Sequence, residues 1–168
     1  MTLTISETRL GEVGFWGRLL GTQPKEVPLD ISPEEIHKLL MDYQMNGQTG
    51  VMSTPMFNDS RYSVLRSDVL EDFVFKHHNR FQAEYIPDVY DCDDFAIAAT
   101  ADISKAAMKQ RMKLPLAFGR TRFTRPNGTG HMMNFAITSD KGLMFYEAGN
   151  GTWISSDTLK GANFYFEL

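Results

Sequence analysis

Apolar residues recur at helical spacing between residues 32 and 44, in the segment SPEEIHKLLMDYQ. Ser32 stands where a helix N-cap is expected, Pro33 suits the first helical position, and Glu35 completes a capping box with Ser32. The apolar positions on one face are Ile36, Leu39, Leu40 and Tyr43. A start signal followed by a 3.6-residue period predicts an amphipathic helix that buries this face.

Two later segments also have helical periodicity. Residues 67–81 group Val69, Leu70, Phe73, Val74 and His77. We expect this helix to pack on the first one, with residues 46–62 as a loop between them. In residues 88–112, one face carries mostly small side chains, namely Phe95, Ala98, Ala99, Asp102, Ile103, Ala106 and Ala107. Small side chains allow a helix to approach a sheet closely, which predicts a central helix that lies against strands.

Beyond Pro115 the pattern changes to short β-rich runs separated by turn signals. The runs are LAFGRTRFT, HMMNFAIT, GLMFYEA and NFYFEL, and the turns are PNGTG, SDKG and a Gly-Asn-Gly sequence. Alternating apolar and polar residues between such turns are typical of antiparallel strands. The fold class predicted is therefore α+β, with N-terminal helices and a central helix packed on an antiparallel β-meander.

Length and composition favour one globular domain over residues 1–168, in which residues 1–30 form an arm or a strand and residues 88–168 form the core. The net charge of -4 argues against nucleic-acid binding, because such binding depends on clustered Lys and Arg. Neither a membrane-spanning run nor a signal peptide is visible, so the expected location is cytoplasmic.

The stretch containing Arg120, Arg122 and Arg125 is interpreted mainly as a solvated strand and secondarily as a small basic edge.

Cys92 is the only cysteine and lies at the predicted start of the long helix. Unpaired N–H groups and the positive end of the helix dipole favour a thiolate there, as a nucleophile requires. The flanking acids Asp91, Asp93 and Asp94 act in the opposite direction, because negative charge raises a thiol pKa. A buried packing role is the competing interpretation of this cysteine.

His131 opens a predicted strand directly after the PNGTG turn, where its ring can face the start of the preceding helix. A histidine in that place can act as the base for a cysteine nucleophile. With a hairpin turn near Asp140 to Gly142, Glu147 returns alongside His131 and can orient its ring; Asn150 is the reserve candidate for this role.

A metal site built from His77 and His78 is a weaker hypothesis, because adjacent helical residues diverge by about 100°.

The segments DCDDFAIA, HMMNFAI and LMFYEAGNG, within residues 88–152, resemble the bacterial transglutaminase-like cysteine proteases of the papain-like superfamily and similar short phage-encoded proteins. This resemblance implies a papain/transglutaminase-like core and places Cys92, His131 and Glu147 on a catalytic triad, although those proteases usually have Asp where Glu147 stands. Periplasmic members depend on calcium, which implies Asp91, Asp93 and Asp94 as Ca²⁺ ligands. From the residues alone we favour the alternative that these acids are dispersed, some capping helix N–H groups and others pairing with Lys or Arg, so that no cofactor is required.

Two functions remain open at this stage. One is a cysteine hydrolase or acyl-transferase acting on a peptide, protein or cell-wall-like substrate through a thioester. Under the other, the chain is a non-catalytic binding or structural module, such as a viral protein, whose pocket recognises a sugar or peptide while Cys92 is inert. Phe15, Trp16 and Trp153 are the contact residues considered for the second function, although core packing is the more common role of such residues.

Overall fold

The computed structural model describes residues 29–45, 53–77, 85–87, 90–124, 127–154, 159 and 162–168. Predictions for residues 1–28, among them Phe15 and Trp16, and those for His78 and Arg125 lie outside the described residues.

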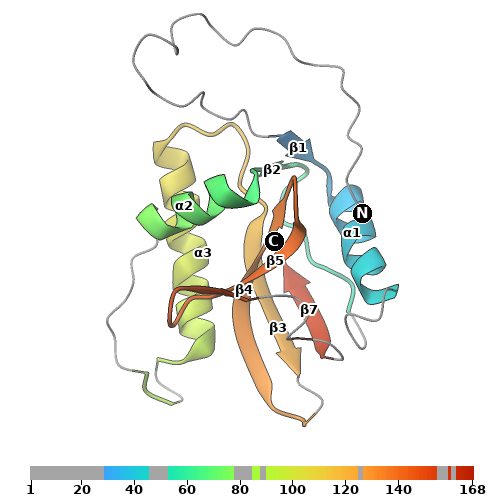
Figure 1. The fold of residues 1–168 in the computed structure, drawn as a ribbon, viewed down its shortest axis with the longest axis vertical. Coiled ribbons are helices and arrows are strands. Elements are labelled where there is room, and N and C mark those ends of the chain that lie inside the picture. Colours follow the sequence, from blue (N-terminus) through green and yellow to red (C-terminus); the bar gives the residue numbers. More distant parts are fainter. Residues whose placement is uncertain are drawn as a thin grey trace, which may run out of the picture.

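The centre of the fold is a five-stranded antiparallel sheet in the order β6-β5-β4-β3-β7 (Figure 1). Its strands are β3 (Phe118–Thr124), β4 (Gly130–Thr138), β5 (Gly142–Glu147), β6 (Thr152–Ile154) and β7 (Asn163–Glu167). A second sheet pairs β1 (Leu29–Ile31) with β2 (Tyr62–Val64), whereas the sequence pattern predicts an arm or a strand over residues 1–30 and a loop over residues 46–62.

The predicted meander describes only part of the large sheet. β3 to β6 follow one another as hairpins, but β7 returns across the sheet and pairs with β3, with Arg120 opposite Glu167. The outer edge of β7 is covered by the segment near Met56, whose backbone N–H donates to the carbonyl of Phe166 at 2.9 Å. The prediction that the strands form a simple meander is therefore wrong, because the last strand pairs with a distant part of the chain.

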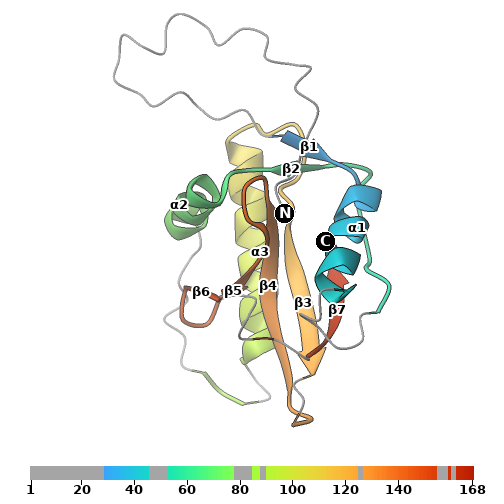
Figure 2. The ribbon, with the colours of Figure 1, turned by 45° about the vertical axis from the view of Figure 1, so that its right-hand side comes forward.

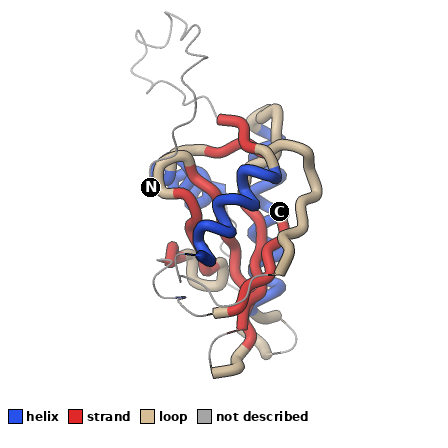
Figure 3. Tube along the Cα trace, turned by 90° about the vertical axis from the view of Figure 1, so that its right-hand side faces the viewer, coloured by secondary structure: helices blue, strands red, loops and turns tan. Residues whose placement is uncertain are grey.

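Helices lie on both faces of this sheet (Figure 2). They are α1 (Pro33–Met45), α2 (Ser67–His77) and α3 (Cys92–Lys109). Figure 3 looks onto the side that α1 covers. Strand side chains alternate between faces, so the fold has two cores: Phe135 and Phe145 share one with α1, and Ala136 and Tyr146 share the other with α2 and α3.

The start of α1 confirms the predicted capping box. The backbone N–H of Ser32 donates to the Glu35 carboxylate at 2.8 Å, and the N–H of Glu35 donates to the Ser32 hydroxyl at 3.3 Å. The predicted packing of the second helix on the first is wrong, since α2 shares its buried cluster with α3 on the opposite face of the sheet. Helical periodicity identifies the buried face but not the partner that covers it.

Small residues bring α3 close to β4, as the sequence predicts, although Ala96 is fully buried whereas the predicted Ala98 and Asp102 are only partly so. The buried Asn134 amide donates to the carbonyl of Ala96 at 2.9 Å and to the Thr100 hydroxyl at 2.9 Å. These bonds fix α3 alongside β4, so the first turn of the helix lies beside the beginning of the strand. No described helix is long and apolar enough to cross a bilayer.

Candidate functional site

The N-terminus of α3 is built by its own acidic residues. Asp91 is the N-cap: its carboxylate accepts from the backbone N–H of Asp93, and the Asp94 carboxylate accepts from the N–H of Asp91 at 3.2 Å. This reciprocal arrangement is a capping box, with Asp in place of the usual Glu at its second position. Two of the three acids beside the cysteine therefore serve the start of the helix.

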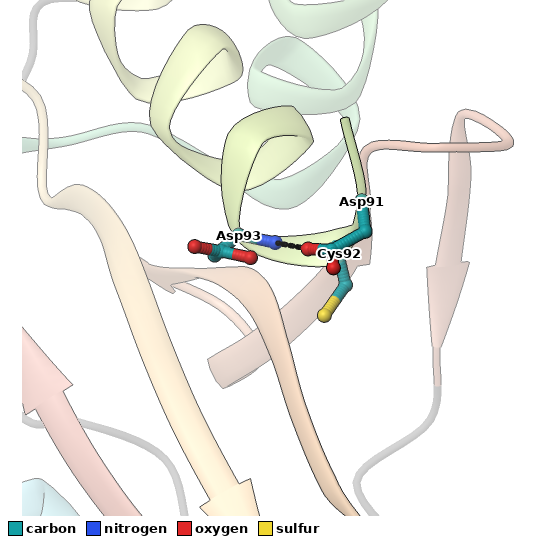
Figure 4. Close-up of side chains that lie close together, drawn as sticks. All are labelled: Asp91, Cys92 and Asp93. Carbon is teal, nitrogen blue, oxygen red and sulfur yellow. Dashed lines mark hydrogen bonds between the residues drawn. The ribbon is translucent and has the colours of Figure 1, made fainter. Parts of the chain in front are cut away.

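Cys92 is the first residue of α3, and its thiol contacts the backbone N–H of Met132 at the beginning of β4. Burial raises the pKa of this thiol, the charges of Asp91 and Asp93 raise it further, and the N–H groups of Met132 and of Cys92 itself only partly offset them. Figure 4 shows the side chains of Asp91, Cys92 and Asp93 close together at the start of α3. With its pKa above the ordinary value, the thiol is protonated at neutral pH.

His131 and Glu147 form a hydrogen-bonded pair across β4 and β5. The Nε2–H group of His131 donates to the Glu147 carboxylate at 2.6 Å, and both side chains are about four-fifths buried. The rings of Phe123 and His131 lie in a T-shaped arrangement, with ring centroids 5.5 Å apart and planes at 87°. The carboxylate fixes the orientation of the imidazole, whose other ring nitrogen, Nδ1, is left out of this bond.

The remaining predicted site residues do not join this pair. Asn150 lies in the turn between β5 and β6, where its side-chain oxygen accepts from the backbone N–H of Thr152 at 3.1 Å. Within the described residues, no hydrogen bond joins the Cys92 sulfur to His131. His77, considered for a metal site, interacts instead with the Gln110 amide at 3.0 Å. A catalytic role for Cys92, His131, Glu147 or Asn150 thus stays a prediction.

The acids at the helix start could also hold a cation. Ligand atoms of Asp91, Cys92 and Asp93 lie within 4.8 Å of one another, whereas Asp94 does not belong to this group. The pKa of Asp93 is raised, chiefly by its hydrogen bond with Asp91. Calcium takes six to eight oxygen ligands, and two carboxylates and a thiol supply too few of the right kind. The residues described here do not fit an all-protein calcium cage.

A groove that the sequence pattern does not predict crosses β4, β3 and β7. The strand register aligns Met132, Arg122 and Tyr165 in one cross-strand row, and Arg120 and Glu167 in the next. These five residues line a groove of about 430 Å³. Met132 connects the surroundings of Cys92 with the groove, since its backbone N–H contacts the Cys92 sulfur and the residue also lines the groove.

Arg120 is not the solvated strand residue that the alternating pattern predicted. Its Nε and Nη2 groups donate to the two carboxylate oxygens of Glu167 at 2.9 and 2.7 Å, a bidentate pair that is largely buried. The sequence contained a partial signal for the groove, in the spacing of Arg120 and Arg122 on one strand. Tyr165 and Glu167 could not be assigned to it, because only the tertiary fold brings β7 beside β3.

No protein-family model and no curated protein matches the chain. Its fold is similar to a structure described as "PSL1a-E64 complex", with a TM-score of 0.64 and 18% identity over 82% of this chain and 51% of that one. It is also similar to Polyporus squamosus lectin bound to the human-type influenza-binding epitope Neu5Aca2-6Galb1-4GlcNAc, with a TM-score of 0.61 and 18% identity over 82% and 50%. The chain spans about half the length of each.

These findings correct the predicted family, fold class and function. A lectin complex is among the structures that share the fold, so the prediction of a transglutaminase-like cysteine protease, with an α+β papain/transglutaminase-like core, is wrong. The predicted cysteine hydrolase or acyl-transferase is withdrawn with it, and the raised pKa of Cys92 agrees with that correction. The acidic segment that carried the resemblance has a local explanation, since Asp91 and Asp94 form a capping box. The chain has a five-stranded antiparallel sheet and three described helices, and its fold is similar to that of a solved lectin structure.

Proposed function

We propose that this chain is a non-catalytic binding module that takes a carbohydrate ligand in the groove over β4, β3 and β7. The groove is the observation that carries the proposal. Its walls are the side chains of Met132 and Tyr165, and its polar groups are those of Arg120, Arg122 and Glu167. A small-molecule site typically combines apolar or aromatic surface with a few fixed polar groups that orient the ligand.

Tyr165 is suited to hold a sugar ring. Its side chain is partly buried, and its hydroxyl contacts the sulfur of Met56 at 3.3 Å, which limits the movement of the ring. An aromatic ring that is held in place presents apolar area at little entropic cost, while arginine and glutamate can bind sugar hydroxyl groups.

Two further observations support a binding role. The fold is similar to that of a lectin bound to a glycan, although 18% identity over half of that chain shows the fold alone. In addition, the thiol of Cys92 has a raised pKa, which disfavours the thiolate that a nucleophile needs. Among the substrates predicted from the sequence, which were a peptide, a protein or cell-wall-like material, only the last would contain a carbohydrate.

The test is the affinity of the chain for a panel of neutral and acidic oligosaccharides, measured by calorimetry. We expect Tyr165→Ala to weaken binding by about tenfold or more, because it removes the aromatic wall. Tyr165→Phe should bind nearly as well as the original chain, which separates loss of the ring from misfolding. Tyr85→Ala is the matched control, since Tyr85 is exposed but does not line the groove. If no oligosaccharide binds, or if Tyr165→Ala binds as well as the original chain, the proposal is wrong.

A further inference from the structure

The two arginines of the groove differ in what they have to offer a ligand. The Nε and Nη2 groups of Arg120 both donate to the carboxylate of Glu167, so the charges of Arg120 and Glu167 largely cancel. Arg122 is exposed, and no hydrogen bond or ion pair joins it to another residue in the part of the chain that the structure describes. The groove therefore contains one guanidinium group that remains available to a ligand.

The position of Arg122 is set by the register of three strands. On β3 it lies opposite Met132 of β4 on one side and opposite Tyr165 of β7 on the other. Its strand position thus lies between two residues with largely apolar side chains. Because Arg122 is exposed, its guanidinium is open to a ligand that enters the groove beside Tyr165.

We propose that Arg122 makes the groove selective for a carbohydrate that carries a carboxylate group, with the sugar ring placed against Tyr165. This inference rests on the proposed function and specifies its ligand class. The planar guanidinium donates two parallel hydrogen bonds to a carboxylate, a geometry that neither a neutral sugar nor a lysine ammonium reproduces.

Because the chain carries a net negative charge, its preference for a carboxylate must come from groups inside the groove. At a net charge of -4 the whole molecule repels an anion at long range, so attraction to a carboxylate must come from groups inside the groove. The preference should therefore be governed by close contact, and it should weaken as the salt concentration rises from low to physiological, because salt screens an exposed guanidinium.

The experiment compares three probes by calorimetry: the trisaccharide Neu5Ac-Gal-GlcNAc, its methyl ester, and the neutral disaccharide Gal-GlcNAc. The original chain should bind the acidic trisaccharide about tenfold or more tightly than its ester, as expected for a charge-assisted hydrogen bond. Arg122→Gln should abolish this difference, and Arg122→Lys should retain only part of it. Arg61→Gln is the control, because Arg61 is an exposed arginine that does not line the groove.

A second variant tests the same idea in the opposite direction. Glu167→Gln removes the negative charge that occupies Arg120, so a second guanidinium becomes available and the affinity for the acidic trisaccharide should rise. The unfolding transition of this variant checks that the β3 and β7 pairing survives. An unchanged or lower affinity in a folded Glu167→Gln variant would contradict the proposed role of charge in the groove.

The outcomes separate the two proposals. If none of the three probes nor any other oligosaccharide binds, the proposed function fails. If the acid and its ester bind equally, or if Arg122→Gln keeps the difference, carbohydrate binding stands and the role of Arg122 is wrong. If a glutamate-rich peptide binds at the groove as tightly as the acidic trisaccharide, the groove recognises carboxylates without regard to the sugar, and the inference is overturned.

Discussion

The backbone N–H of Met132 contacts the sulfur of Cys92, so the first residue of α3 lies against the beginning of β4. This contact stabilises a thiolate, but burial and the charges of Asp91 and Asp93 outweigh it, and the pKa of the thiol is raised. The chemistry of Cys92 is therefore set by its surroundings and not by its place at a helix start alone.

We expect iodoacetamide to alkylate Cys92 slowly at neutral pH, with a rate that reaches half its maximum above about pH 8.5, the value of an unperturbed thiol. The double variant Asp91→Asn, Asp93→Asn should lower this midpoint, since it removes two negative charges and keeps a capping side chain. Asp30→Asn serves as a distant control. A midpoint well below that of a free thiol would contradict the inert role of Cys92 and reopen a nucleophilic one.

Calcium should not stabilise the fold. Asp91 and Asp94 are engaged in the capping box of α3, and the acids nearby offer fewer oxygens than a calcium site needs. We expect the same melting temperature in EGTA and in millimolar Ca²⁺. An increase of several degrees on adding Ca²⁺ would show a site, because a ligand that binds only the folded state stabilises it by mass action.

Removing the Asp140 side chain should destabilise the fold, since it anchors the start of α2. Its carboxylate accepts from the backbone N–H of Ser67 at 2.8 Å and from the Ser67 hydroxyl at 2.7 Å. We expect Asp140→Ala to lower the free energy of unfolding by about 1 to 2 kcal/mol, measured with urea. Asp72→Ala, which removes an exposed pair with Lys76, should change it much less.

The same residue predicts a pH dependence. Burial raises the pKa of Asp140, but the hydrogen bonds from Ser67 and from the backbone outweigh it, so the folded pKa lies below the ordinary value of 3.8. The carboxylate therefore contributes stability above that pH, and the contribution is lost as the pH falls through the folded pKa. The difference in stability between the original chain and Asp140→Asn should accordingly shrink in acid; a difference that grows below pH 3.8 would contradict this account.

Gly119 should not tolerate a side chain. A Cβ atom at this position would lie 2.2 Å from the carbonyl oxygen of Glu167, which is backbone and cannot move without displacing β7. We expect Gly119→Ala to reduce stability by about 2 kcal/mol or more and to weaken ligand binding, because β7 carries part of the groove. Gly130→Ala is the control, since nothing lies within 4 Å of its Cβ position. Equal stability of the two variants would show that β3 and β7 pair differently.

The sequence determined the features that depend on near neighbours. The capping box of Ser32 and Glu35 and the helix that begins at Cys92 were predictable, because caps and helical periods are formed by residues a few positions apart. The hairpin that brings Glu147 alongside His131 was predictable for the same reason, since a short turn fixes the register of the strands that it joins.

The tertiary structure decided which distant segments meet. Periodicity did not show that α2 packs with α3, or that β7 returns to β3 and carries Tyr165 and Glu167 into a groove with Arg122. The pKa of Cys92 was undecided by sequence too, because a helix start lowers it while burial and neighbouring charges raise it, and only their geometry sets the balance. Local signals fix elements, whereas contacts between distant strands are selected by the burial of the whole chain.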